Sequence, residues 1–293
     1  MKKILITGEN SYVGTSVEKY LSQWPDRYRV DTVDMIGDAW RGKSFAGYDT
    51  VYHVAGIAHS DVGKVSGECK ALYFRVNTEL TIETARKAKA DGAKQFIFMS
   101  SAIVYGNSAP IGCKKRVGRD TPVAPANFYG ESKVKAEQGI LPLSADGFRV
   151  CVIRSPMIYG PGCKGNYPVL AKLARKLPLF PRTENERSML YVENLAEFVR
   201  LMIDNEESGI FMPQNADYVS TDRMVRQIAA AHGKKICVIP GFGWALKLMS
   251  RVTGLVNKAF GNLSYDQTAG RYKRDYQVCD FEESIRRTEG AAK

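Results

Sequence analysis

The chain has 293 residues, which is enough to bury a sizeable core in one large domain or in two unequal ones. Its 44% apolar and 25% charged content is ordinary for a soluble globular protein; with no apolar run long enough to span a bilayer and no signal-peptide pattern, this favours a cytoplasmic protein. The excess of 42 Lys and Arg over 31 Asp and Glu, a net charge of +11, is compatible with an anionic small substrate, an anionic membrane surface or a nucleic acid; no nucleic-acid motif is present, so we expect no nucleic-acid partner.

The six cysteines are scattered along the chain and form no C-x-x-C pair. In a reducing compartment such cysteines act as small apolar residues, so we expect free thiols. No cluster has the spacing of metal ligands, and the sequence predicts no metal site.

The first pattern is an apolar strand over residues 3–7, followed by a turn and by an amphipathic helix to about Gln23. A strand, a glycine turn and a helix N-terminus together form a binding site for the diphosphate of a dinucleotide, because backbone N–H groups point at the phosphates. The usual pattern is G-x-x-G-x-x-G, and here Ser11 replaces the middle glycine. We expect cofactor contacts from Gly8, Asn10, Ser11, Tyr12, Val13 and Gly14.

A second strand is predicted over Arg29 to Val33, and Asp34 follows it, about 20 residues past the turn. A carboxylate there can accept from the adenosine ribose hydroxyls and repels a 2′-phosphate, which favours NAD over NADP; an ordinary loop aspartate is the alternative. Asp38 is a second cofactor candidate, for the adenine side. The segment before Asp49 is short, so the next strand of the usual fold is expected to be reduced or missing.

Residues 49–56 read as a strand that ends in small residues, against which a flat ligand could lie. His53 in this apolar strand is expected to be structural rather than catalytic. A long helix is predicted from about Cys69 to Asp91, with Gly92 as its C-terminal cap. Further cofactor contacts are expected from Val54, Ala55, Gly56 and Asn77.

Residues 95–100 form the next predicted strand, which ends in Ser100 and Ser101. A loop over residues 107–126 leads to a helix that begins near Asn127. Tyr129 and Lys133 are four apart on that helix, so they share a face. An ammonium close to a phenol lowers the pKa of the phenol, and the tyrosine can then exchange a proton with a sugar hydroxyl. A surface pair without chemistry is the alternative.

Another strand is predicted from Arg149 to Arg154, and the regular alternation weakens after it. Further helices are expected near 167–176, 193–205, 221–232 and 244–260, with short strands near 209–212 and 235–239. Alternating strands and helices predict an α/β fold, a Rossmann-type doubly wound parallel sheet over residues 1–160, with a smaller, interleaved α/β substrate-binding lobe over 161–293. The strand ends at Gly8, Asp34, Ala55 and Ser101 should then meet at one edge of the sheet.

The segment 242–263 combines an apolar helical face with lysines and an arginine. One interpretation is a helix that packs on the substrate lobe. The other is an interfacial helix that makes weak contact with an anionic membrane surface, which would suit a lipid-linked sugar diphosphate.

Together these motifs resemble the extended short-chain dehydrogenase/reductase family and, within it, the nucleotide-sugar epimerase/dehydratase group, over about residues 3–200. The form of residues 154–167 is similar to a bacterial polysaccharide-biosynthesis branch, with Met157 where many sugar epimerases have an asparagine. The residues that carry the resemblance are the turn from Gly8 to Gly14, Asp34, residues 53–55, Asn77, residues 100–106, Tyr129 with Lys133, Arg154 with residues 159–162, and residues 187–192.

The resemblance implies that Tyr129 is the general acid and base, that Ser101 orients the reacting oxygen and that Lys133 holds the cofactor ribose. It implies a cofactor contact at Ser100 and a homodimer through helices near 77–91 and 128–139. Arg187 would meet the substrate diphosphate, with a surface salt bridge as the alternative. The expected substrate contacts are Ile103, Met157, Asn166 and Arg187.

These expectations point to an NAD-dependent 4-epimerase of a UDP-hexose or a UDP-N-acetylhexosamine. One alternative is an NAD(P)H-dependent 4-keto reductase of a nucleotide-linked sugar, and another is a catalytically inactive dinucleotide-binding regulatory protein. Dehydration is disfavoured because Ser101-Ala102-Ile103 carries no acidic group.

Overall fold

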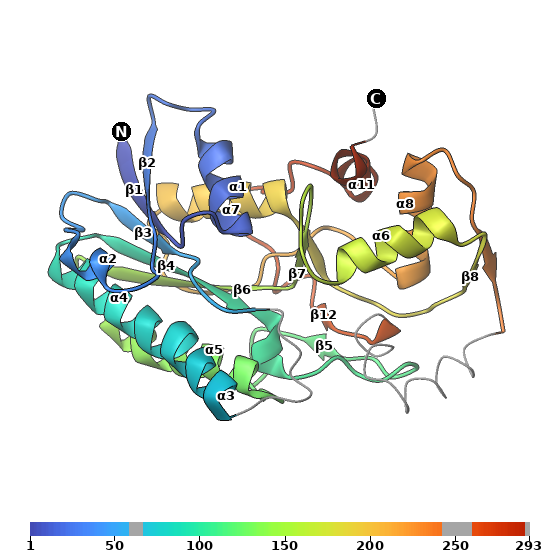
Figure 1. Cartoon of the computed structure of the whole chain (residues 1–293), viewed down its shortest axis with the longest axis horizontal. Coiled ribbons are helices and arrows are strands. Elements are labelled where there is room, and N and C mark those ends of the chain that lie inside the picture. Colours follow the sequence, from blue (N-terminus) through green and yellow to red (C-terminus); the bar gives the residue numbers. More distant parts are fainter. Residues whose placement is uncertain (59–66, 242–259, 291–293) are drawn as a thin grey trace. The chain divides into compact units, whose positions relative to one another are not determined.

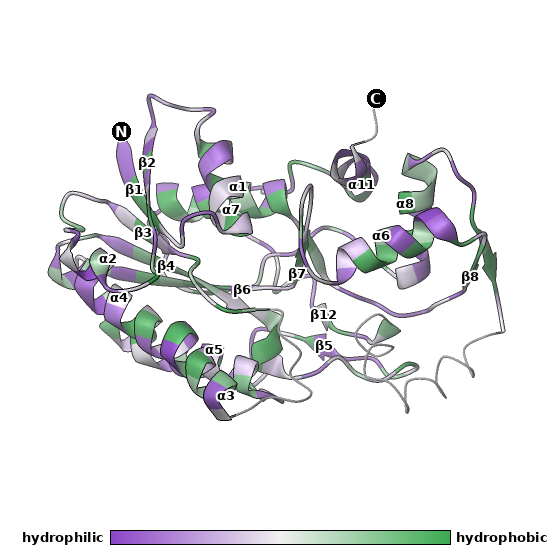
Figure 2. Cartoon of the chain, viewed as in Figure 1, coloured by the Kyte–Doolittle hydropathy of each residue, from purple (hydrophilic) through white to green (hydrophobic). Residues whose placement is uncertain are grey.

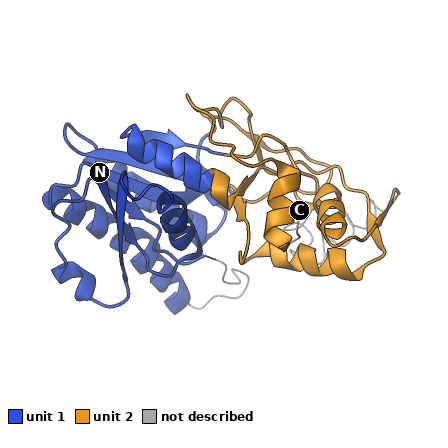
Figure 3. Ribbon diagram, turned by 90° about the horizontal axis from the view of Figure 1, so that it is seen from above, with its two compact units in different colours: residues 1–106, 122–155, 195–213 blue, residues 107–121, 156–194, 214–293 orange. Residues whose placement is uncertain are grey.

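The computed structural model describes residues 1–58, 67–241 and 260–290. The chain divides into two compact units that interleave along the sequence (Figure 3). Unit 1 contains Met1–Gly106, Pro122–Ser155 and Leu195–Pro213, and unit 2 contains Asn107–Thr121, Pro156–Asn194 and Gln214–Lys293. Unit 1 therefore includes residues 195–213, which lie beyond the domain boundary expected at residue 160.

Unit 1 is built on a six-stranded sheet in the order β10-β6-β4-β3-β1-β2, and every neighbouring pair is parallel. Helices α1 and α7 lie on one side of this sheet and α3, α4 and α5 on the other (Figure 1). This is the predicted Rossmann-type doubly wound arrangement. Its strands are β1 Lys2–Thr7, β2 Tyr28–Val33, β3 Thr50–His53, β4 Gln95–Ser101, β6 Arg149–Ser155 and β10 Gly209–Phe211. Its helices are α1 Tyr12–Leu21, α2 Ala39–Gly42, α3 Gly67–Phe74, α4 Leu80–Ala90, α5 Phe128–Ile140 and α7 Val192–Asp204.

The central strands are buried on both faces, as expected for a parallel sheet covered by helices. Phe96 and Phe98 of β4 belong to a buried cluster with Ala85 of α4 and Ala136 of α5. Small residues let these helices pack closely, since a Cβ added at Gly139 would lie 2.2 Å from the Cδ1 of Ile82. Figure 2 shows polar and apolar bands alternating along α3, α4 and α5, consistent with one packed face and one solvent face.

Two local features refine the predicted elements of unit 1. The helix predicted over residues 69–91 is divided into α3 and α4 by a π-helical turn, Arg75–Glu79, which contains Asn77. Such turns often occur at functional positions. Residues 34–49 contain the short α2 and no strand, as the length of that segment predicts.

Unit 2 contains short strands that pair in parallel as β5 with β12, β7 with β9 and β8 with β11. The helices predicted near 167–176 and 221–232 are confirmed, and the loop predicted over 107–126 contains β5. The helix near 244–260, and most of the segment 242–263, fall outside the described residues. The strands are β5 Arg116–Val117, β7 Met157–Tyr159, β8 Leu179–Pro181, β9 Met189–Tyr191, β11 Cys237–Ile239 and β12 Ser264–Tyr265, and the helices are α6 Asn166–Lys176, α8 Thr221–Ala231 and α11 Phe281–Glu289. Within the ranges that the structure describes, every helix is too short or too polar to cross a bilayer.

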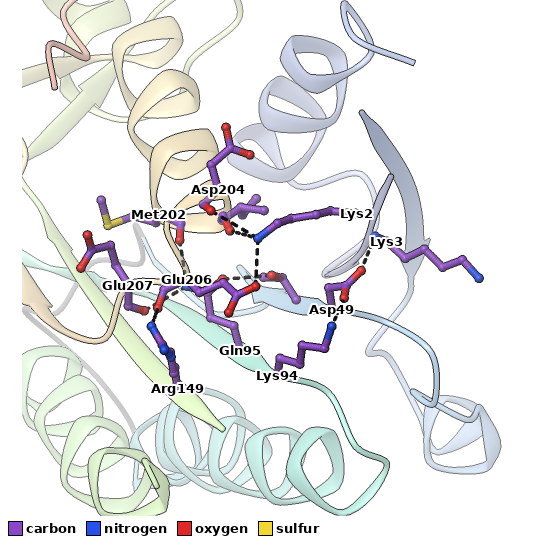
Figure 4. Close-up of polar contacts among 12 residues, drawn as sticks. Lys2, Lys3, Asp49, Lys94, Gln95, Arg149, Met202, Asp204, Glu206 and Glu207 are labelled. Atoms are coloured by element: carbon purple, nitrogen blue, oxygen red, sulfur yellow. Dashed lines mark hydrogen bonds and ion pairs between the residues drawn. The ribbon is translucent and has the colours of Figure 1, made fainter. Parts of the chain in front are cut away.

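The edge of the unit 1 sheet at which the strands begin carries a network of polar side chains around the C-terminal end of α7 (Figure 4). Lys2 donates from Nζ to the carbonyl of Ile203 at 2.7 Å and pairs with Glu206 at 3.2 Å. The buried Gln95 donates from Nε2 to the carbonyls of Met202 and Glu207, both at 2.9 Å, and Arg149 donates to the carbonyl of Glu206 at 2.8 Å. We call Lys2, Gln95 and Arg149 the amino-edge cluster; its side chains donate to carbonyls in the last turn of α7 and in the residues that follow it.

Candidate active site

The turn after β1 has the backbone that close approach of a ligand requires. Gly8 has a φ of +98°, and a Cβ at this position would lie 2.9 Å from the backbone nitrogen of Ala55. Ser11, which replaces a glycine of the usual pattern, has an ordinary extended conformation and accepts a hydrogen bond from the nitrogen of Gly14 at 3.2 Å as the N-cap of α1. The left-handed residue is Asn10, with a φ of 61°, a conformation that asparagine tolerates. The substitution at Ser11 is therefore compatible with the turn.

This turn is compatible with the diphosphate of a dinucleotide, because it leads into the N-terminus of α1, where the N–H groups of the first helical turn are available to an anion. Asp34 follows β2 directly, is exposed and accepts from the nitrogen of Ile36 at 3.0 Å. Asp38 pairs with Arg41, which also binds Glu83. The cofactor contacts at Asp34 and Asp38 remain predictions.

The end of β3 is tied to the end of β1 and to α4 through His53. The nitrogen of Val54 donates to the carbonyl of Thr7 at 3.2 Å, and His53 bridges the hydroxyls of Thr7 at 2.7 Å and Thr81 at 3.1 Å. Burial lowers the pKa of His53 to about 3, so it is neutral near pH 7. These contacts confirm the structural role predicted for His53.

Asn77 links the loop after β3 to α5. Its Oδ1 accepts from the nitrogen of Ile57 at 2.8 Å, and its Nδ2 donates to the Oγ of Ser132 at 3.2 Å. A Cβ added at Gly56 would lie 3.0 Å from Oδ1 of Asn77 and 3.4 Å from Nζ of Lys133. Asn77 and Lys133 therefore both lie beside Gly56, in the loop that follows β3. A direct contact between Asn77 and a cofactor stays a prediction.

Ser101, Tyr129 and Lys133 come together at the edge where β4 ends. Asn127 begins α5 by accepting from the nitrogen of Gly130 at 2.9 Å, which sets Tyr129 in the first turn. The side chain of Ser101, the last residue of β4, lies close enough to the phenol of Tyr129 to lower its pKa. Lys133 is buried and donates from Nζ to the carbonyl of Met99 at 2.9 Å. The strand end and the helix start thus hold all three side chains in one place.

The structure corrects the expectation that Lys133 lowers the pKa of Tyr129. Burial raises the pKa of Tyr129 to about 12, and the nearby hydroxyl of Ser101 opposes that rise only in part. Burial also lowers the pKa of Lys133 to about 8, against the attraction of Glu137. Spacing on a helix indicated the shared face but not the loss of solvation, which dominates here.

Ile103 lies in a short 3-10 turn, Ala102–Tyr105, that packs against the start of α5. A Cβ added at Gly130 would lie 2.9 Å from the carbonyl oxygen of Ile103, so glycine is required for this approach. Met157 in β7, Asn166 at the start of α6 and Arg187 all lie in unit 2. Burial lowers the pKa of Arg187. The substrate contacts predicted for these four residues remain predictions.

Two buried charged side chains behind the site were not predicted as functional. Glu137 accepts from the Oγ of Ser100 at 2.5 Å and from Nη2 of Arg154 at 2.6 Å. Arg154 also donates to the hydroxyl of Tyr105 at 2.7 Å. The hydroxyl of Ser100 donates to Glu137, and the cofactor contact expected at Ser100 remains a prediction. The available signal was the position of Glu137 four residues after Lys133, on the face that carries Tyr129.

Comparison with known proteins agrees with this geometry. The family model described as "NAD dependent epimerase/dehydratase family" matches residues 4–212. The UDP-glucose 4-epimerase of Vibrio cholerae is 32% identical over 289 residues, covering 90% of this chain and 87% of that protein. The N-acetyl-alpha-D-glucosaminyl-diphospho-ditrans,octacis-undecaprenol 4-epimerase of Escherichia coli O157:H7 is 28% identical over 281 residues, covering 86% and 81%.

Among solved structures, MoeE5 in complex with UDP-glucose and NAD superposes with a TM-score of 0.68 at 18% identity, covering 98% of this chain and 97% of that chain, which shows the shared fold. The glycine turn, the Ser101, Tyr129 and Lys133 group and the matched length lead to one assignment. The chain belongs to the NAD dependent epimerase/dehydratase family, a branch of the extended short-chain dehydrogenases/reductases.

Proposed function

We propose that the protein is an NAD-dependent 4-epimerase of a nucleotide-linked hexose. The observation that carries this proposal is the convergence of Ser101, Tyr129 and Lys133 at the strand ends. Two relatives that the chain matches over most of their length are named as 4-epimerases, which supports it. Proton transfer by a phenol held against a hydroxyl side chain is the chemistry that such an arrangement can perform.

The residues that would hold NAD lie along the strand ends of unit 1. The turn from Gly8 to Gly14 would bind the diphosphate, Asp34 the adenosine ribose, and Lys133 the nicotinamide ribose. When bound, NAD supplies the hydride acceptor for the sugar C4 and a positive charge beside the phenol, which favours the ionised form of Tyr129. The negative charge of Asp34 repels a 2′-phosphate and favours NAD over NADP.

Side chains of the protein transfer the proton of the sugar O4 hydroxyl. Tyr129 takes the proton from the sugar O4 as the C4 hydrogen leaves as hydride, so that the alcohol becomes a 4-ketone. The keto sugar then rotates in the pocket. The hydride returns to the opposite face of C4, and Tyr129 gives the proton back to O4. Ser101 holds O4 during both steps. The cycle consumes no external reductant.

The proposed substrate is a UDP-hexose or a UDP-N-acetylhexosamine. Both named relatives have in common a hexose attached to a diphosphate. Arg187 would bind that diphosphate through its two-pronged guanidinium, while Ile103, Met157 and Asn166 would line the sugar. Ala102 and Ile103 supply no acid beside Ser101, so elimination of water is not proposed.

The test is incubation of the purified chain with UDP-glucose and, separately, with UDP-N-acetylglucosamine, without added reductant. We expect conversion of one of them to its C4 epimer, detected by chromatography, and no conversion by Tyr129→Phe. Conversion of only a polyprenyl-diphosphate-linked sugar would replace the nucleotide in the proposal by a lipid. Stoichiometric loss of NADH on a 4-keto sugar nucleotide, with no epimer exchange, would establish a reductase instead.

A further inference from the structure

Unit 1 buries a carboxylate and a guanidinium that the proposed reaction does not use. Glu137 of α5 is 3% exposed and Arg154 of β6 is 8% exposed. Burying two charges is costly, and an apolar pair of similar volume commonly gives equal or greater stability. A buried pair directly behind an active site therefore needs a reason beyond packing.

One face of α5 holds the last three residues of β4. Tyr129 lies beside the Ser101 side chain, Lys133 donates to the carbonyl of Met99 at 2.9 Å, and Glu137 accepts from the Oγ of Ser100 at 2.5 Å. The three side chains of α5 are four residues apart, one turn after another. Glu137 thus fixes the residue immediately before Ser101, and through it the hydroxyl that faces Tyr129.

Glu137 is itself held by Arg154. The carboxylate accepts from Nη2 at 2.6 Å and from Nε at 3.2 Å, while Nη1 of Arg154 donates to the hydroxyl of Tyr105 at 2.7 Å. Tyr105 ends the short turn that begins directly after Ser101. The carboxylate is therefore held by Ser100 of β4 and Arg154 of β6, and Arg154 is itself held by the turn after β4.

From this geometry we infer that Glu137 is a positioning residue: it sets the Ser101 hydroxyl against Tyr129 and keeps the Lys133 side chain in its charged form. The inference rests on the proposed epimerase function. Glu137 does not touch the reacting atoms and acts through Ser100 and Lys133.

The electrostatics around Lys133 support this role. The ionisable groups that face it are Tyr129 and Glu137 on its own helix and His53 of β3, with Arg154 and Tyr105 behind Glu137. His53 is neutral because burial lowers its pKa to about 3, and Tyr129 stays protonated below a pKa of about 12. Burial lowers the pKa of Lys133 to about 8, and the Coulomb attraction of Glu137 is what opposes that fall.

The test compares Glu137→Gln with Glu131→Gln, a matched change on the same helix at a residue that does not face Lys133. Glutamine can still accept from Ser100 but carries no charge. The readout is the titration of Lys133 by the ¹³Cε resonance of labelled lysine in the full chain, assigned by its loss in Lys133→Arg. We expect the Lys133 midpoint to fall by about one to two pH units in Glu137→Gln and to stay unchanged in Glu131→Gln.

In the epimerase assay, kcat of Glu137→Gln should begin to fall at a pH lower than in the wild type by the same number of pH units. KM should stay within about twofold of the wild type. Glu137→Asp, which keeps the charge, should move this pH back toward that of the wild type. An unchanged Lys133 midpoint in Glu137→Gln, with lower thermal stability, would overturn the inference and leave a purely structural role.

A second variant keeps the test decisive if Glu137→Gln fails to fold with Arg154 unpaired. Glu137→Gln/Arg154→Gln removes both buried charges and should fold. The Lys133 midpoint should still lie below that of the wild type, and an unchanged midpoint would count against the inference. Because the titration needs no turnover, it remains informative if the wild-type chain shows no epimerisation and the proposed function fails.

Discussion

The two edges of the unit 1 sheet use the same strands for different purposes. β1 begins with Lys2 and ends before the Gly8 turn, and β4 begins with Gln95 and ends with Ser101. At the amino edge, long polar side chains bind the carbonyls that end α7. At the carboxyl edge, the chain turns tightly at Gly8 against Ala55, and Ser101, Tyr129 and Lys133 come together. We infer that stability and chemistry are assigned to opposite ends of each strand, and the predictions below test that separation.

Tyr129→Phe should give the largest effect, and it should be one of activity alone. The ring and its edge contact with Tyr73 at 5.9 Å remain, while the proton carrier is lost. We expect kcat to fall by about 10²- to 10⁴-fold, with no loss of thermal stability. Tyr20→Phe, which removes a hydroxyl bonded to Glu197 at 3.1 Å, is the matched control and should keep full activity. Wild-type activity in Tyr129→Phe would show that Tyr129 is not the proton carrier, whereas no activity in the wild-type chain itself would favour a dinucleotide-binding protein without catalysis.

Gln95→Met should show the opposite pattern. The change removes the hydrogen bonds that Gln95 donates to the carbonyls of Met202 and Glu207, and it removes the acceptor of the buried Thr50 hydroxyl. We expect the free energy of unfolding, measured in urea, to fall by about 3 kcal/mol, with kcat unchanged well below the melting temperature. Gln23→Met, at an exposed position, should be nearly neutral. A large loss of kcat in Gln95→Met would break the separation of the two edges.

Gly8→Ala should affect both properties, because the backbone at Gly8 packs tightly against Ala55 and belongs to the turn proposed to bind the cofactor diphosphate. The added Cβ would lie 2.9 Å from the backbone nitrogen of Ala55, and the residue has a φ of +98°, which alanine rarely adopts. We expect a loss of about 2 kcal/mol in unfolding free energy and loss of NAD from the purified protein, read by absorbance after denaturation. Gly37→Ala, also at positive φ but with no atom within 4 Å, should cost only about 1 kcal/mol and retain NAD. Equal NAD content in both variants would argue against the diphosphate site.

Lys2→Met should give the smallest effect. Its side chain is 28% exposed, and its bonds to Ile203 and Glu206 lie at the rim of the amino-edge cluster. We expect a loss of about 1 kcal/mol in unfolding free energy and unchanged activity. Lys3→Met is the control, since only the backbone of Lys3 contacts Asp49 and its side chain points away from the cluster (Figure 4). If both variants lose the same stability, the cluster contributes nothing through Lys2.

Local patterns predicted the parts of the site that depend on spacing. The glycine turn, the cap at Asn127 and the shared face of Tyr129 and Lys133 all follow from residues within one helical turn. Contacts between distant segments could not be predicted. Gln95 binds carbonyls more than 100 residues away in the sequence, and the π-helical turn coincides with a buried Asn77 whose partners lie in other elements. The pKa of Tyr129 was mispredicted because burial is a property of the whole fold.

The interleaving of the two units has a consequence for biogenesis. The sheet of unit 1 is completed only by residues 195–213, which add β10 along β6. During synthesis, the unit 2 residues Asn107–Thr121 and Pro156–Asn194 are made before the strand β10. Until then, β6 is an unpaired edge strand of the nascent sheet, and another chain could add a strand to it. A chaperone that shields this edge, or a slow stretch of codons placed after residue 213, would be the natural means of preventing aggregation.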